Sequence, residues 1–230
     1  MQILAFDTSS QTVSVAILRD EDILYDTIMN TGQNHSEVLL PSIDQACVLA
    51  GVHISQIDLF ACTIGPGSFT GLRIGLSTMK GLMMATGKPG VGVSSLQALA
   101  LNVGQAEKTV GSMIDAGRGQ VYLAYFQYDQ DGHLNQLGSE QALDPQKIGE
   151  YSGHDAIYVG DGAIKYAGVI TSFLNHNNTI ASDEKQFIHA SSVGSLAIAK
   201  YRRNDLLHLQ KSIPVYLRSA DARPTKPLFP

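Results

Sequence analysis

Residues 3–10 read Ile-Leu-Ala-Phe-Asp-Thr-Ser-Ser, an apolar strand that ends in an acid and runs into small, turn-forming residues. The alternating segment 12–18 predicts a second strand directly after this turn. The same order recurs in the second half, where 110–114 is apolar, Asp115-Ala-Gly follows, and 120–128 alternates. Because one plan occurs twice, the sequence predicts two related subdomains of strands and helices.

The segments between the two repeats predict two helices and a glycine-rich turn. Apolar residues at helical spacing favour a helix from about residue 36 to Gly51. A buried strand at 59–64 is then followed by a turn and a second helix over 69–86. We divide the chain softly into an N-terminal subdomain, 1–103, and a smaller C-terminal subdomain, 104–230.

The end of the chain is basic although the whole chain is acidic. From Lys200 to Pro230 the net charge is +5, and the remaining chain carries −10, which together give −5. An acidic body argues against a primary nucleic-acid binder, because it repels phosphate. The basic tail either lies in solvent or touches RNA or an acidic partner.

Composition indicates a folded chain that does not enter a membrane. Of the 230 residues 44% are hydrophobic and only 16% are charged, against a usual charged share of about 25%. Cys47 and Cys62 lie in apolar stretches and cannot form a disulfide framework, which favours a reducing compartment. No stretch reaches the ~18 apolar residues of a membrane span. We therefore expect a soluble protein of the cytoplasm.

Two turns could carry nucleotide chemistry. Asp7 with Thr8 and Ser9, and Asp115 with Gly117, each place an acid and small residues at the end of a strand. Backbone N–H groups in such turns can hold phosphate while a carboxylate holds Mg²⁺ through water. An acid after a strand also simply starts a turn, so the pattern alone leaves both readings open.

Metal catalysis has little support in the sequence. None of the seven histidines has a second histidine four residues away, the spacing that would put two imidazoles on one helix face. Neither cysteine has a neighbouring base in the sequence, and no nucleophile-elbow pattern occurs. We therefore predict no metal ligands and no catalytic residues.

The helix expected over 69–86 is unusual because it contains glycines. Gly71, Gly75 and Gly81 each cost about 1 kcal/mol relative to alanine inside a helix. Two accounts compete. The glycines let the helix press against its own sheet, or they let the helix of another chain approach between methionines such as Met79 and Met83.

Five segments together are similar to the TsaB family, also called YeaZ. They are Ile3-Leu-Ala-Phe-Asp-Thr-Ser-Ser with Ser14-Val-Ala-Ile, His35-Ser-Glu-Val-Leu-Leu-Pro, Gly65-Pro-Gly-Ser-Phe-Thr-Gly-Leu-Arg-Ile-Gly, Gly92-Val-Ser-Ser-Leu and Pro214-Val-Tyr-Leu-Arg. The resemblance implies an α/β fold of the actin-like ATPase class, ribonuclease H-like, with two repeated subdomains whose mixed sheets are flanked by helices. The match is close over the first hundred residues and thinner beyond.

The resemblance also implies a function in bacterial tRNA modification. Proteins of this family are understood as non-catalytic partners of TsaD, which transfers a threonylcarbamoyl group from its adenylate to adenosine beside the anticodon of tRNAs that read codons starting with A. TsaE is an ATPase that joins the two. TsaD-type proteins carry a His-x-x-x-His metal pair, and Ser95 and Leu99 stand at the matching positions here. The resemblance thus implies that the turns at Asp7 and Asp115 are remnants of two nucleotide loops.

The resemblance further implies a partner face on the N-terminal subdomain. Its two helices would pair with those of TsaD as a heterodimer or, when the chain is alone, with a second copy as a homodimer. The residues that we expect in this bundle are Leu39, Ile43, Cys47, Gly71, Gly75, Met79 and Met83. tRNA would be reached mainly through the complex, and a nucleotide at the seam with TsaD stays open.

Two other classes of function remain as alternatives. One is a metallopeptidase-like protein of the glycoprotease family, which would need a metal pair. The other is a stand-alone kinase or ATPase that binds Mg-ATP through Asp7 and Asp115.

Overall fold

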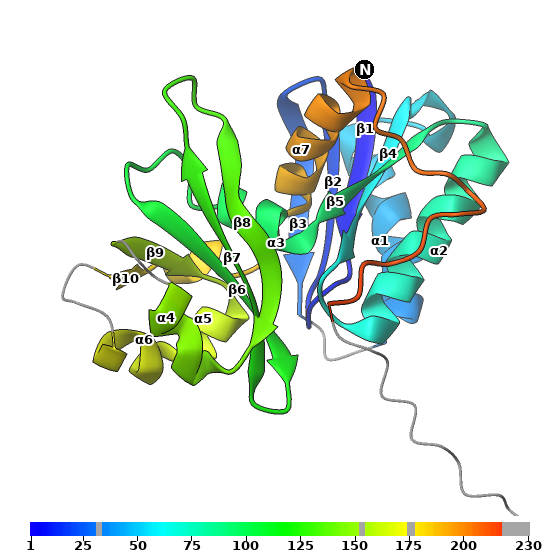
Figure 1. Ribbon diagram of the computed structural model, residues 1–230. Helices are drawn as coiled ribbons and strands as arrows, with labels where there is room; N and C mark the ends of the chain where they lie inside the picture. The colour runs from blue at the N-terminus through cyan, green and yellow to red at the C-terminus, as the bar shows by residue number, and fades with distance from the viewer. Residues whose placement is uncertain (31–33, 152–154, 174–177, 218–230) are drawn as a thin grey trace, which may run out of the picture.

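Two five-stranded sheets form the framework of the chain (Figure 1). The computed structural model describes residues 1–230 except 31–33, 152–154, 174–177 and 218–230. The first sheet consists of β1 (Gln2–Asp7), β2 (Val13–Arg19), β3 (Asp22–Met29), β4 (Leu59–Gly65) and β5 (Gly90–Ser94). The second consists of β6 (Thr109–Gly117), β7 (Gln120–Tyr128), β8 (Leu134–Leu143), β9 (Ala156–Val159) and β10 (Thr179–Ile180).

The helices lie between and outside the two sheets. They are α1 (His35–Ala50), α2 (Phe69–Thr86), α3 (Ser95–Leu101), α4 (Ile148–Tyr151), α5 (Asp161–Lys165), α6 (Ala167–Phe173) and α7 (Ala190–Arg202). Short 3-10 turns add Ile54–Gln56, Pro145–Lys147 and Asp183–Lys185. None of the described helices combines the length and the apolar run that crossing a bilayer requires.

The two sheets repeat one topology, which confirms the duplicated plan. The first has the order β3-β2-β1-β4-β5 and the second β8-β7-β6-β9-β10, so β6 corresponds to β1. In each sheet the first three strands in sequence are antiparallel, and the two that follow run parallel to the first. Helices connect the parallel strands, as such crossovers require.

Strand alternation sorts the core into layers. Leu4 and Phe6 of β1 face α1 and α2, whereas Ile3 and Ala5 face α3 and α7. The cluster that contains Ile3 and Ala5 also includes Val110 and other side chains of the second sheet. A third cluster packs the far side of the second sheet against α4, α5 and α6 (Figure 1). Helices α3 and α7 therefore lie between the two sheets, and α1 with α2 covers the outer face of the first.

The last helix packs on the first sheet although it comes late in the chain. Gly194 of α7 approaches so closely that a Cβ there would lie 2.5 Å from the side chain of Leu18 and 3.4 Å from that of Ala5. Val193, Ala197 and other α7 residues share a buried cluster with β1 and β2. The division into 1–103 and 104–230 stays a prediction, and residues 190–202 complete the core of the first sheet.

A side-chain clasp fixes the start of α7 to the edge strand β3. Nδ1 of His189 lies 3.2 Å from Oδ2 of Asp26, and the Ser191 hydroxyl donates to the same oxygen at 2.6 Å. The hydrogen bond to Asp26 is the main reason why the pKa of His189 is raised above its ordinary value. The clasp thus favours the protonated form of His189 in the folded chain.

We expect His189 to make folding stability pH-dependent. Because its pKa is higher in the folded than in the unfolded chain, its contribution is complete below the unfolded pKa of about 6.5 and is lost as pH rises through the folded pKa. The free energy of unfolding of wild type minus that of His189→Gln should therefore fall between pH 6 and 8, by less than about 1 kcal/mol for a partly exposed pair. Urea unfolding of both proteins at several pH values measures this difference in the free energy of unfolding. In an Asp26→Asn background the pH dependence should shrink, although the Glu184 carbonyl still favours the protonated form, and an undiminished dependence would contradict the clasp.

Candidate partner-binding site

The start of α2 and the glycine-rich residues 65–68 before it pack tightly on residues 8–12, the turn between β1 and β2. Ser68 caps the helix, with its hydroxyl accepting from the N–H of Gly71 at 3.2 Å, and its own N–H donates to the Ser9 carbonyl at 2.7 Å. A Cβ at Gly71 would lie 1.9 Å from the carbonyl oxygen of Thr8. At Gly67 a Cβ would lie 2.3 Å from that of Ser9. The missing side chains thus allow the helix start to touch the backbone of residues 8–9.

The acid of this turn faces into the protein. Asp7 is fully buried, and its Oδ1 accepts from the Ser9 N–H at 3.0 Å, the Ser9 hydroxyl at 2.6 Å and the Thr63 hydroxyl at 2.5 Å. Burial raises the pKa of Asp7, and these hydrogen bonds only partly offset that rise. Residues 67–71 pack directly on this turn, against the carbonyl oxygens of Thr8 and Ser9.

The matching turn of the second sheet is held by a cation of this chain. Asp115 accepts from Nζ of Lys165 at 2.6 Å and from the N–H of Gly117 at 3.1 Å. Its own N–H donates to Asp161 at 2.9 Å, and burial is the main reason why the pKa of Asp161 is raised. The carboxylate of Asp115, which a bound Mg²⁺ would need, is therefore paired with the ammonium group of Lys165.

The positions that match the TsaD metal pair carry no metal ligand. Ser95 is fully buried at the start of α3, and Leu99 is 1% exposed in the central core. Among the described residues one group of three ligands comes close enough to hold an ion: Asp129, Asp131 and His133. All three are exposed in the β7–β8 turn, where Asp129 accepts the backbone N–H groups of the other two. That geometry is explained by the turn itself.

The residues expected in the partner interface lie largely inside this chain. Leu39, Ile43 and Cys47 of α1, and Met79 and Met83 of α2, are between 0% and 7% exposed and pack into the core of their own sheet. Gly71 and Gly75 face the β1–β2 turn, since a Cβ at Gly75 would lie 2.5 Å from the Thr8 hydroxyl oxygen. The first account of the glycines therefore holds for Gly71 and Gly75, whereas Gly81 is exposed and a Cβ there would have nothing within 4 Å. The apolar stripe that the sequence reveals is the inner side of the two helices.

The outer side of α1 and α2 carries large apolar side chains of its own. Exposure is 55% for Leu40, 71% for Val48, 61% for Leu49 and 74% for Met84. The two helices are in contact and form one layer over the sheet (Figure 1). We call Leu40, Val48, Leu49 and Met84 the outer face. Large apolar groups exposed on one helix layer are a common feature of protein–protein contacts.

A C-terminal segment borders this layer. Residues 205–217, here named the strap, follow the edge of the first sheet, where the N–H of Leu207 donates to the Gly90 carbonyl and that of Val215 to Ile64. Nζ of Lys80 in α2 donates to the Ser212 carbonyl at 2.7 Å. A Cβ at Gly65 would lie 2.3 Å from the carbonyl oxygen of Val215. The strap therefore fixes α2 from its side, and the basic tail beyond 217 lies outside the described residues.

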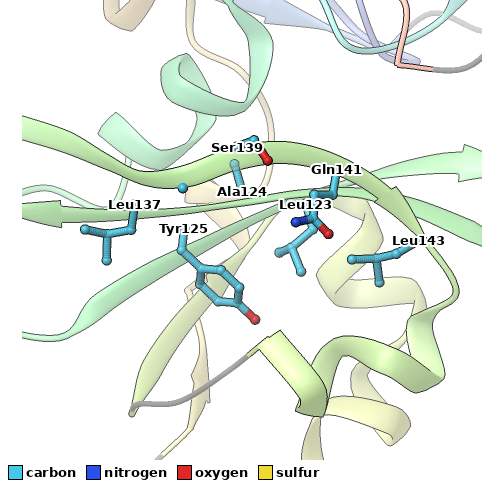
Figure 2. A pocket seen from close by; sticks show the side chains of 8 residues that line it. Leu123, Ala124, Tyr125, Leu137, Ser139, Gln141 and Leu143 are labelled. Carbon is cyan, nitrogen blue, oxygen red and sulfur yellow. The ribbon is translucent and has the colours of Figure 1, made fainter.

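A pocket of about 170 Å³ lies elsewhere, over β7 and β8 (Figure 2). Leu123, Tyr125, Leu137, Gln141 and Leu143 are among the side chains that line it. The Tyr125 hydroxyl is 3.2 Å from that of Tyr158, and burial raises the pKa of Tyr125 far above its ordinary value. None of the predicted site residues lines this pocket.

The fold is shared with a solved structure of distant sequence. Component A of (R)-2-hydroxyglutaryl-CoA dehydratase from Acidaminococcus fermentans superposes with a TM-score of 0.54 at 13% identity, over 88% of this chain and 99% of that one. Together with the duplicated sheets, this places the chain in the actin-like ATPase fold class. The expected fold class is thus confirmed.

The family follows from closer relatives. The family model described as TsaD, tRNA N6-adenosine threonylcarbamoyltransferase, matches residues 29–224. The structure titled YeaZ from Pseudomonas aeruginosa has a TM-score of 0.81 and 30% identity, covering 94% of this chain and 99% of that one. The tRNA threonylcarbamoyladenosine biosynthesis protein TsaB of Bacillus subtilis is 28% identical over 96% of both chains. The chain therefore belongs to the TsaD family and, within it, to the TsaB (YeaZ) proteins.

Proposed function

We propose that this chain serves the biosynthesis of threonylcarbamoyladenosine in tRNA as a non-catalytic subunit in the cytoplasm. It binds a TsaD-type threonylcarbamoyltransferase through the outer face of α1 and α2, and TsaE joins the two. The same face forms a homodimer when the chain is alone, and tRNA is reached mainly through the complex. One observation carries the proposal: the chain belongs to the TsaB proteins, and buried Ser95 and Leu99 stand where TsaD-type proteins have their two metal-binding histidines.

The two strand-end turns support a non-catalytic role. We propose that residues 7–9 and 115–117 are remnants of nucleotide loops, because Asp7 is buried under the start of α2 and Asp115 is paired with Lys165. A carboxylate sequestered in this way is not available to a Mg-nucleotide. Neither turn favours the stand-alone kinase or ATPase.

Reconstitution with the partner tests the function. We expect the purified chain alone to form no threonylcarbamoyladenosine on tRNA. The TsaD-type protein and TsaE of the same organism should form it at least tenfold faster with the chain than without it. The modified nucleoside is measured by mass spectrometry after digestion of the tRNA. A partner that reaches the same rate alone would contradict the proposal.

Two measurements on the isolated chain address the alternatives. A stoichiometric zinc ion linked to peptidase activity would support the metallopeptidase-like reading. Tight Mg-ATP binding in calorimetry, lost in Asp7→Ala and retained in Asp129→Ala, would support the kinase reading. We expect neither result.

A further inference from the structure

An arginine at the start of α2 is held in a fixed position on the protein surface. The guanidinium of Arg73 lies 3.8 Å above the centre of the Phe69 ring, and its Nε donates to the Tyr216 hydroxyl at 3.1 Å. The rings of Phe69 and Tyr216 are themselves 4.9 Å apart. Two elements far apart in the sequence, α2 and the strap, thus hold one exposed cation.

The remaining donors of this guanidinium are available to a ligand. Within the part of the chain that the structure describes, Arg73 makes no other hydrogen bond and no ion pair. Its two terminal nitrogens form a planar fork, the geometry that matches both oxygens of a carboxylate. Stacking and the Nε bond have already ordered the side chain, so that less entropy is lost on binding.

The position of Arg73 connects it to the outer face. Arg73, Ser77 and Met84 are all exposed and, at four and seven residues apart, lie along one side of α2. Phe69 and Tyr216, 36% and 37% exposed, extend the apolar surface around the cation. Arginine and aromatic side chains, as in this group of three, are enriched among the residues that dominate protein–protein contacts.

We propose that Arg73 is a receptor for an aspartate or glutamate side chain of the partner protein that docks on the outer face. This inference rests on the proposed function. A carboxylate fits better than RNA phosphate, because phosphate binding draws on several cations. The exposed residues of neighbouring α1 include the acids Glu37 and Asp44, and Lys80 is engaged by the strap. Among the described residues, Arg73 offers one pre-ordered guanidinium fork beside two aromatic rings, and one such fork suits one anionic side chain.

Affinity measurements with the full chain and the TsaD-type protein of the same organism test the proposal. We expect Arg73→Ala to weaken binding about 30-fold and Arg73→Lys nearly as much, because an ammonium cannot form the planar fork. Tyr216→Phe should weaken it about threefold, since only the bond that positions Nε is lost. Arg202→Ala on α7, an exposed arginine on the other side of the sheet, is the matched control and should change nothing. Reversing the charge of the paired acid in the partner should restore binding to Arg73→Glu.

The outcomes separate this inference from the function on which it rests. If Arg73→Ala binds the partner within twofold of wild type while Met84→Asp abolishes binding, the carboxylate receptor is wrong and the docking face stands. If neither substitution changes affinity, the docking face itself is wrong. If Arg73→Ala leaves the partner bound but weakens tRNA binding in a filter assay, the ligand is phosphate, which also overturns the proposal.

Discussion

Met84→Asp is expected to weaken binding of the TsaD-type partner at least 100-fold while the chain stays folded. Met84 is 74% exposed on α2, so a charged side chain there is fully solvated in the free chain. In the docked state the carboxylate would be removed from water between α2 and the partner. Burying an unpaired charge costs several kcal/mol, and about 3 kcal/mol already corresponds to a hundredfold loss. Surface plasmon resonance measures the affinity.

Two variants control for this substitution. Met84→Leu keeps an apolar group of similar volume and should bind within about threefold of wild type. Ile164→Asp introduces the same charge at a residue that is 49% exposed on α5, beside the second sheet, and should bind normally. Sedimentation of the isolated chain should show self-association falling in Met84→Asp. Wild-type affinity in this variant, with an unchanged circular dichroism spectrum, would place the docking surface elsewhere.

Gly71→Ala is expected to destabilise the fold by about 3 kcal/mol or more. An added Cβ would lie 1.9 Å from the backbone oxygen of Thr8, which is no flexible side chain and cannot move aside cheaply. Relief requires α2 to shift away from the β1–β2 turn, which also breaks the 2.8 Å hydrogen bond from the Thr8 hydroxyl to the Gly71 carbonyl. Losses of this size come from overpacking or broken buried contacts. The thermal midpoint should fall by about 10 °C.

Gly81→Ala is the matched control within the same helix. Nothing lies within 4 Å of a Cβ built at Gly81, so alanine there only improves helix propensity. We expect a gain of up to about 1 kcal/mol, read from the same thermal melts. Equal destabilisation by both substitutions would mean that helix propensity, rather than contact with Thr8, decides the effect. A neutral Gly71→Ala would contradict the close packing of α2 on the turn.

Elements with a strong pattern could be predicted from the sequence, and elements held by their neighbours could not. The structure confirms the predicted bounds of α2 and β7, because both have clear periodicity and turn residues at their ends. β8 (Leu134–Leu143) is missing from the prediction. It is a mostly exposed edge strand of polar residues, and its pairing with β7 rather than its own side chains holds it in the sheet.

The candidate site shows a similar limit. The sequence identifies the two helices, but the periodicity of an amphipathic helix marks the side that is most apolar, which in a folded chain faces the core. Leu40 and Val48 could be found only as apolar residues on the side that also carries Glu37 and Asp44. The hydrogen bond between Arg73 and Tyr216 could not be predicted from the local sequence of either segment, because 143 positions separate the two residues.

The place of α7 has a consequence for how the chain is made. A ribosome delivers the N-terminus first, yet one face of the first sheet, with Ile3 and Ala5, is covered by residues 190–202. Until those residues emerge, the nascent chain holds an apolar surface without its final cover, which is the condition under which folding chains bind chaperones or aggregate. Completion of this face of the first sheet therefore waits for α7, which is made after all ten described strands.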